Sequence, residues 1–286
     1  MPLLLQCKSG LGVCWGPTLS ECAHALKQYR DTHAGKYPVL NVPIFPTVGL
    51  PPVLHGSTTA WSATQVAQML SRAMRLTGDV PSLDSFPPLL SGKYAEEPDR
   101  SYILEFFKLQ HGYKAVFGST NGKPGLIDDA DGLITGAGSN ELWPQFGSDS
   151  MLRADVSPDT LRELIAGDIG GVVIRAPGQH CGSEFKKLRQ QWIGLTLKHI
   201  RRVNDNADRS GGPGVVLCAM GSSKAGIVRE LINSHKVVRH LIVDHHLAAA
   251  LGAHTAPNGA TASARPRHAT TQVRAPSKDA PYAPDE

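Results

Sequence analysis

The sequence contains no apolar run long enough to span a lipid bilayer, which takes roughly 20 consecutive apolar residues in a helix. Its first residues, MPLLLQ, also lack the charged segment and the length of a secretory signal. We therefore expect a cytoplasmic protein that makes no membrane contact.

Cysteine is scarce and irregularly spaced. The five cysteines form no C-x-x-C pair, and their odd number argues against a disulfide framework. Two of them, Cys14 and Cys218, lie in apolar segments and are expected to be small core residues. The pattern favours a reducing environment and predicts no metal site. The cysteines are Cys7, Cys14, Cys22, Cys181 and Cys218.

The excess of positive charge is small, at +4 over 286 residues, and no basic arm or Lys/Arg-rich helix is present. Composition therefore gives no support to nucleic-acid binding. Two enzyme signatures are missing as well. Residues 136–138 form a G-x-G pattern without the third glycine and downstream acid of a dinucleotide site, and G-x-S-x-G is absent. We expect no cofactor and no serine hydrolase.

What the sequence does contain is a strand–loop–helix–strand unit over residues 214–251. A glycine-bounded apolar run is followed by apolar residues at helical spacing and by a second apolar run at 241–243. The loop between them, Gly221-Ser222-Ser223-Lys224, would offer an anion free backbone N–H groups, a helix dipole and an ammonium group. Alternatively, a serine only caps the helix and the lysine is a solvated charge. The residues alone leave both open.

A similar junction lies near the N-terminus. Residues 11–15 predict a strand, a Gly-Pro turn follows, and a helix is expected to extend to about Tyr29, with Thr18 placed to cap it or to meet an anion. A further glycine-bounded strand is predicted at 132–135. The alternation of buried strands and helices predicts the α/β class, with a mainly parallel, Rossmann-like sheet flanked by helices.

Shorter patterns complete the prediction. Strands are expected at 39–45, 114–117 and 172–175, and helices at 61–76 and 101–110. The segment 190–203 has mixed spacing and is expected to lie on the surface.

The last part of the chain differs in composition. Residues 252–286 are rich in Ala, Pro, Thr and Ser and have almost no large apolar side chain, so they cannot bury enough surface to offset the entropy of ordering. We expect one ordered domain over residues 1–251 and a disordered tail over 252–286.

Three segments resemble the sugar-binding effector domain of the SorC family of bacterial transcriptional regulators. Residues 12–19 (GVCWGPTL) are similar to its G-V-S-W-G-x-T-L opening, and 164–171 (LIAGDIGG) to its G-D-I segment. Residues 219–225 (AMGSSKA), followed by LIVD at 241–244, are similar to its glycine–lysine loop and last strand. The resemblance covers about residues 11–251.

The resemblance implies a fold related to glucosamine-phosphate deaminase and ribose-phosphate isomerase, in which a sugar phosphate lies across the C-terminal ends of the strands. It also implies a dimer or tetramer. The resemblance further implies three groups of site residues. The phosphate would be held by Gly16, Thr18, Gly221, Ser222, Ser223 and Lys224. The pocket would be lined by Gly56, Ser57, Gly136 and Gly138, and the sugar hydroxyls would contact Asp168.

The sequence also departs from the family. SorC regulators carry a helix-turn-helix domain before the opening strand, where this chain has only a short segment, and Pro17 stands where an arginine is often found. We therefore expect a sensor that stands alone, or acts in a mixed oligomer with a full-length regulator, and does not bind DNA itself.

Two enzyme alternatives remain. Asp244-His245-His246 resembles the D-H-H motif of manganese-dependent phosphoesterases, although the further metal ligands of those enzymes are missing from earlier strands. A sugar-phosphate isomerase or deaminase would need carboxylates beside the substrate, for which Asp168 and Asp131 are candidates. The Asp-x-His pattern of the deaminases is absent from residues 136–141.

Overall fold

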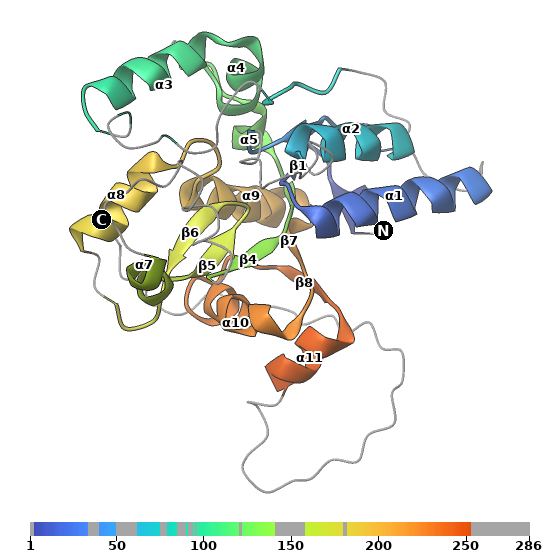
Figure 1. The fold of residues 1–286 in the computed structure, drawn as a ribbon. Helices are drawn as coiled ribbons and strands as arrows, with labels where there is room; N and C mark the ends of the chain where they lie inside the picture. Colours follow the sequence, from blue (N-terminus) through green and yellow to red (C-terminus); the bar gives the residue numbers. More distant parts are fainter. Residues whose placement is uncertain are drawn as a thin grey trace, which may run out of the picture.

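The computed structural model describes residues 3–33, 40–49, 62–74, 79–84, 90, 94, 96–119, 122–140, 158–179 and 182–252 (Figure 1). Its centre is a five-stranded parallel sheet in the order β2-β1-β3-β7-β8. The strands are β1 Leu11–Val13, β2 Ile44–Pro46, β3 Gly132–Thr135, β7 Gly214–Ala219 and β8 His240–Val243. The four apolar runs expected to be parallel strands are thus confirmed, and so is the α/β class.

The three inner strands are buried along their whole length. This explains why β1, β3 and β7 are continuous apolar runs in the sequence rather than alternating ones, because both faces of the sheet are covered. The order of the strands reverses between β1 and β3, since the chain adds β2 on one side of β1 and then β3, β7 and β8 on the other. In open α/β sheets, ligands bind at the C-terminal ends of the strands beside such a reversal.

Helices cover the large sheet. The helices α1 Pro17–Thr32 and α2 Ala63–Met74 pack against each other, with α2 also against β1 and β2, while α9 Leu197–Ser210 packs against β3 and β7 (Figure 1). The other helices are η1 Leu4–Gln6, α3 Asp99–Leu109, α4 His111–Phe117, α5 Leu126–Asp129, α7 Pro158–Leu164, α8 Ser183–Gln191, η4 Ser222–Lys224, α10 Ala225–Asn233 and α11 His245–Gly252.

A second, antiparallel sheet grows out of the first one. It consists of β4 Ala137–Ser139, β5 Ile165–Ile169 and β6 Val172–Arg175, and only Gly136 separates β4 from β3. The register pairs Gly138 with Asp168. Since α10 packs against β4 and β5, the small sheet is fixed next to the loop that follows β7.

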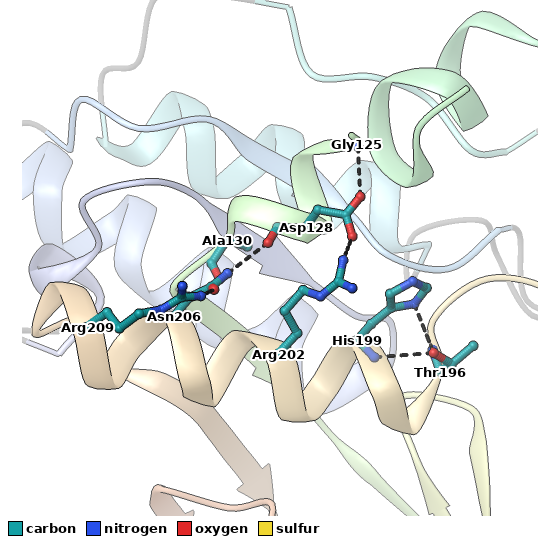
Figure 2. Close-up of polar contacts among 8 residues, drawn as sticks. All are labelled: Gly125, Asp128, Ala130, Thr196, His199, Arg202, Asn206 and Arg209. Atoms are coloured by element: carbon teal, nitrogen blue, oxygen red, sulfur yellow. Dashed lines mark hydrogen bonds and ion pairs between the residues drawn. The ribbon is translucent and has the colours of Figure 1, made fainter. Parts of the chain in front are cut away.

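The helix α9 corrects our expectation that residues 190–203 lie mostly on the surface. Its Ile200 and Val203 are fully buried against the core. One turn further on, Asn206 donates hydrogen bonds to the carbonyl oxygens of Asp128 (2.9 Å) and Ala130 (2.8 Å), and Arg202 forms an ion pair with the Asp128 carboxylate (Figure 2). The expectation failed because residues 190–203 include the end of α8 and the connection before α9, which hide the helical spacing of the α9 residues.

Two further expectations were wrong. Residues 114–117, predicted as a strand, belong to α4, in which Tyr113, Val116 and Phe117 pack toward the core at the i, i+3, i+4 spacing of a helix face. The strand β5 was not predicted, because Gly167 and Asp168 interrupt its apolar residues.

The expected tail, from residue 253 onward, lies outside the described residues, and the last described helix ends at Gly252. Among the residues that the structure describes, no helix combines the length and the apolar character needed to cross a membrane.

Candidate functional site

The C-terminal ends of β1, β3 and β7 meet around Gly136. A Cβ atom placed on this glycine would lie 3.8 Å from the carbonyl oxygen of Cys218 and 3.9 Å from that of Trp15. Trp15 lies two residues after the end of β1, and Cys218 is the second-last residue of β7. The two junctions singled out in the sequence therefore open on one edge of the sheet, on either side of β3.

The first junction connects β1 to α1. Gly16 has φ 122°, a backbone conformation that side chains disfavour, and it is the N-cap of the helix, with Pro17 as the first helical residue. Thr18 is thus the second residue of the helix and not its N-cap. Because the N-cap is a glycine, no side chain caps the first N–H groups of α1. The first backbone N–H groups of a helix have no acceptor within it, so this turn presents donors at the sheet edge.

The second junction connects β7 to α10 through the 3-10 turn η4. Gly221, with φ 89°, is the N-cap of this turn, and Lys224 is the N-cap of α10. Neither of these residues provides a side-chain capping bond, and Ser222 and Ser223 are exposed. The alternative in which a serine serves as the helix cap is therefore not the arrangement observed.

Lys224 is half-buried beside two carboxylates. Burial lowers the pKa of its amine, and the nearby carboxylates of Asp168 and Asp244 act in the opposite direction. The ammonium group is therefore partly removed from water, which strengthens its interaction with any anion that reaches it.

Asp168 lies in β5 and is 9% exposed. Its Oδ1 accepts a hydrogen bond from the Gly171 N–H at 2.7 Å, which closes the turn between β5 and β6. Gly138 lies directly opposite in β4, and a Cβ atom there would overlap the Asp168 carboxylate. The Asp168 carboxylate therefore fills the space that a side chain at position 138 would need, although the two residues are thirty positions apart in the sequence.

Asp244 follows β8, and its role was not predicted from the sequence. Its carboxylate accepts hydrogen bonds from the Gly221 N–H, at 3.2 Å to each oxygen, and from the Leu247 N–H at 2.9 Å. These bonds lower the pKa of Asp244, with the bond from Leu247 having the largest effect. A single carboxylate thus caps α11 and holds the start of the Gly221–Lys224 loop. An aspartate between a strand and a helix was the available signal.

The two histidines after Asp244 are exposed and begin α11, and their ring centroids lie 3.8 Å apart. Within the described part of the chain, no group of three or more His, Cys, Asp or Glu residues is arranged to hold a metal ion. The Asp244 carboxylate has a structural role here, capping α11 and fixing the neighbouring loop.

Asp131, the second candidate carboxylate of an isomerase, lies at the opposite end of the sheet because it immediately precedes β3. It accepts hydrogen bonds from the backbone N–H groups of Lys8 (3.0 Å) and Gly10 (3.4 Å) and from the Ser210 hydroxyl (2.7 Å). It fixes the entry of the chain into β1 and β3 and is far from Asp168 along the strand direction.

The structure therefore places most of the expected site residues at one edge of the sheet, whereas Gly56 and Ser57 lie outside the described residues. The residues at this edge are Gly16, Thr18, Gly136, Gly138, Asp168, Gly221, Ser222, Ser223 and Lys224.

Several solved structures have a similar fold, although no protein-family model and no curated protein matches the sequence. The probable sor operon regulator from Shigella flexneri has a TM-score of 0.58 at 17% identity, over 85% of this chain and 79% of that one. A domain of a possible sugar-binding transcriptional regulator from Arthrobacter aurescens TC1 has a TM-score of 0.55 at 16% identity, over 85% and 78%. This chain has the fold of the SorC-type regulator domains.

The full-length sorbitol operon regulator SorC from Klebsiella pneumoniae has a TM-score of 0.56 at 16% identity. The alignment covers 85% of this chain but 66% of that regulator. The likeness indicated by three sequence segments is thus confirmed as a likeness of fold. The SorC-type fold brings the three segments to the large sheet and to the small sheet beside it.

Proposed function

We propose that this chain is an effector domain that binds a sugar phosphate at the C-terminal edge of its parallel sheet. The observation that carries the proposal is the half-buried Lys224 at this edge, next to two helical N-termini that have no side-chain cap. Anions bind at such N-termini because backbone N–H groups and the positive end of the helix dipole coincide there.

The phosphate is held between the two junctions. On one side, the Gly16 backbone and the Thr18 hydroxyl contribute donors, and on the other side the backbone amides of Ser222 and Ser223 and the ammonium group of Lys224 do so. The position of the two junctions on either side of β3 supports this arrangement.

The sugar ring lies toward the small sheet. Asp168 accepts hydrogen bonds from its hydroxyl groups, and Gly136 and Gly138 line the pocket because neither has a side chain to fill it. The register that brings Gly138 against Asp168 supports this part of the proposal. Gly56 and Ser57 complete the lining in the proposal.

The site binds its ligand without converting it. The similar proteins are described as operon regulators or as a transcriptional regulator, and the second carboxylate that an isomerase would use is at the other end of the sheet. We propose that the protein acts in the cytoplasm, as a homo-oligomer or in a mixed oligomer with a full-length regulator, and makes no direct contact with DNA.

Isothermal titration calorimetry with a panel of sugar phosphates, the parent sugars and inorganic phosphate tests the proposal. At least one sugar phosphate is expected to bind more tightly than its parent sugar. A charge-assisted contact contributes roughly 1.5–3 kcal/mol, so Lys224→Ala should weaken this binding about ten- to a hundredfold.

Lys27→Ala is the matched control, because Lys27 lies on the C-terminal half of α1 and pairs with Asp31 on the surface. It should bind like the wild type. Equal affinities for the wild type and Lys224→Ala would contradict the site. Conversion of the bound sugar phosphate during the titration would favour the isomerase or deaminase instead.

A further inference from the structure

The helix α3 carries an apolar stripe on its solvent-exposed side. Tyr102, Phe106 and Leu109 are 71%, 58% and 63% exposed, and their i, i+4, i+7 spacing places them on one face of the helix. The opposite face packs on the core through Phe107, which is buried, and Ile103. A helix on the surface of a domain needs only one apolar face, so the second face of α3 is available to another molecule.

We propose that a second copy of this chain covers the stripe, so that the α3 helices of the two copies pack antiparallel across a two-fold axis. The inference rests on the proposed function for the homo-oligomer, whose contact surface it names, and not for the sugar-phosphate site. A two-fold interface brings the same surface of both copies together, so this surface must be complementary to itself.

The apolar residues of the stripe are complementary to themselves. When the two-fold axis passes between positions 105 and 106, Tyr102 lies opposite the partner's Leu109, because these two positions are equally far from the axis. The two Phe106 side chains meet next to the axis, at the centre of the contact. Aromatic side chains at the centre of an interface contribute much of its binding energy.

The charges at the two ends of α3 favour the antiparallel arrangement. Three exposed carboxylates lie at its start, and Arg100 pairs with only one of them. Lys108 and Lys114 lie toward its other end. Parallel packing would bring the two acidic ends together, whereas antiparallel packing brings each acidic end to the basic end of the other copy and opposes the helix dipoles. The acidic residues are Glu96, Glu97 and Asp99.

An ion pair beside the stripe adds to this match. Glu105 Oε1 and Lys108 Nζ are 2.7 Å apart. Because position 105 is next to the two-fold axis, each Glu105 would lie between its own Lys108 and the partner's Lys108. Positive and negative charges then alternate along this side of the contact, and the exclusion of water strengthens their attraction.

The area of the stripe determines how strong the dimer is. A large side chain buries roughly 150–250 Å² when it is covered completely, so at the observed exposures the stripe offers on the order of 300–400 Å² per copy. Two stripes together supply about half of the roughly 1,600 Å² of a standard interface. With the charged ends of α3 added, we expect a dissociation constant on the order of micromolar and not an obligate dimer.

Sedimentation velocity of the ligand-free protein tests the contact. Between about 1 and 100 µM, the wild type is expected to change from monomer to dimer. Phe106→Glu places a negative charge at the centre of the contact, next to its own copy, and should raise the dissociation constant at least about tenfold. Tyr29→Glu is the matched control, because Tyr29 is an aromatic residue on α1 that is 50% exposed, and it should dimerise like the wild type.

Cross-linking with a short bismaleimide tests the antiparallel register. Cys22 and Cys181 are first replaced by serine, and the other three cysteines are buried. Glu105→Cys should link to its own copy, because the two positions are offset by about 1.5 Å along the helices. Ser101→Cys is the control on the same side of α3 and should not link, since its two positions are offset by about 14 Å.

Three results would overturn the proposal. The first is a wild type that stays monomeric up to 100 µM, since another protein must then cover the stripe. The second is a folded Phe106→Glu that dimerises like the wild type. The third is equal cross-linking at positions 101 and 105, which parallel packing would give. Should Phe106→Glu fail to fold, Leu109→Glu at the exposed end of the stripe tests the same contact.

Calorimetry separates the dimer from the sugar-phosphate site. None of the residues proposed for that site lies on α3, so Phe106→Glu should bind a sugar phosphate like the wild type. A protein that dimerises as expected and binds no sugar phosphate would contradict the site and support the dimer. A monomer that binds a sugar phosphate would contradict the dimer alone.

Discussion

Gly138 shows how a single residue shapes the proposed site. Its lack of a side chain leaves the Asp168 carboxylate next to the β4 backbone, and the same carboxylate holds the Gly171 N–H. A side chain at this position would displace the carboxylate that we propose for the sugar hydroxyls.

We expect Gly138→Ala to lower the free energy of unfolding by about 1–3 kcal/mol, because the added methyl group must push aside a buried carboxylate. Binding of the sugar phosphate should weaken at the same time. Urea unfolding and calorimetry measure the two effects.

Gly226→Ala is the matched control, since Gly226 lies within α10 and a Cβ atom there meets nothing within 4 Å. It should stabilise the protein by up to about 1 kcal/mol through helix propensity. If Gly138→Ala and Gly226→Ala changed the free energy of unfolding by the same small amount, the methyl group would fit beside Asp168 and the prediction would be wrong.

Among the elements, the parallel strands were the most predictable part of the chain. Continuous apolar runs beside glycines indicated β1, β3 and β7, because strands buried on both faces need apolar residues at every position. The edge strand β8 is only partly buried and was indicated by its own short apolar run. The strand β5 escaped prediction because Gly167 and Asp168 interrupt its apolar residues. The helix α9 escaped prediction because residues 190–203 include the end of α8, the connection after it and only the first half of α9. The hydrogen-bond partners of Asn206 come from a distant segment, which the spacing of residues does not show.

Asn206 joins α9 to the segment that leads into β3 (Figure 2). We expect Asn206→Ala to cost about 1–3 kcal/mol of unfolding free energy, because two carbonyl groups lose their donor in a largely buried place. Asp205→Ala, at the exposed neighbouring position of the same helix, is the control and should change the free energy by less than about 0.5 kcal/mol. Chemical denaturation distinguishes them, and two equal losses would exclude the role of Asn206.

The start of α9 makes the fold sensitive to acid. Thr196 and His199 form a capping box, in which the Thr196 hydroxyl accepts from the His199 N–H (3.3 Å) and the His199 Nδ1 accepts from the Thr196 N–H (3.2 Å). Burial, and to a smaller extent Lys198, lowers the pKa of His199 below its ordinary value of 6.5. The unfolded chain therefore takes up a proton at His199 more readily than the folded protein.

Well above pH 6.5, His199 is neutral in both the folded and the unfolded state, so it does not change the free energy of unfolding. As the pH falls through 6.5 toward the lower pKa of the folded state, the unfolded chain binds the proton first, and the free energy of unfolding decreases. We expect a smaller free energy of unfolding at pH 5.5 than at pH 7.5, and we expect His199→Gln to reduce this difference. Burial also lowers the pKa of His240, so part of the difference should remain. An unchanged difference in His199→Gln would contradict the assignment.

For the molecule as a whole, the sequence predicted that two junctions meet at one sheet edge. The prediction follows from topology, because the C-terminal ends of parallel strands lie at the same edge of a sheet. The position of Thr18 and Lys224 at this edge could therefore be predicted without knowing any side-chain contact. The pairing of Gly138 with Asp168 depends on the register of an antiparallel sheet that was not foreseen. The bond from Gly221 to Asp244 joins two loops, and no spacing in the sequence indicates it.

The boundary of the ordered domain is open to a direct test. Arg229 on α10 donates a hydrogen bond to the Ala250 carbonyl, so α11 belongs to the fold up to its end at Gly252. We expect a chain that ends at Gly252 to keep the melting temperature and the ligand affinity of the full chain, because residues 253–286 have almost no large apolar side chains to bury. Differential scanning calorimetry measures the first and titration the second. A lower melting temperature would show that the tail contributes to the fold.

Asp244 gives the proposed binding loop a property that its sequence does not suggest. By holding the Gly221 N–H and the first turn of α11, this carboxylate orders the loop in the free protein. The conformational entropy of the loop is therefore lost when the chain folds and not when a ligand arrives. A ligand that docks there meets a preorganised turn, and its affinity is limited chiefly by the loss of its own motion and hydration.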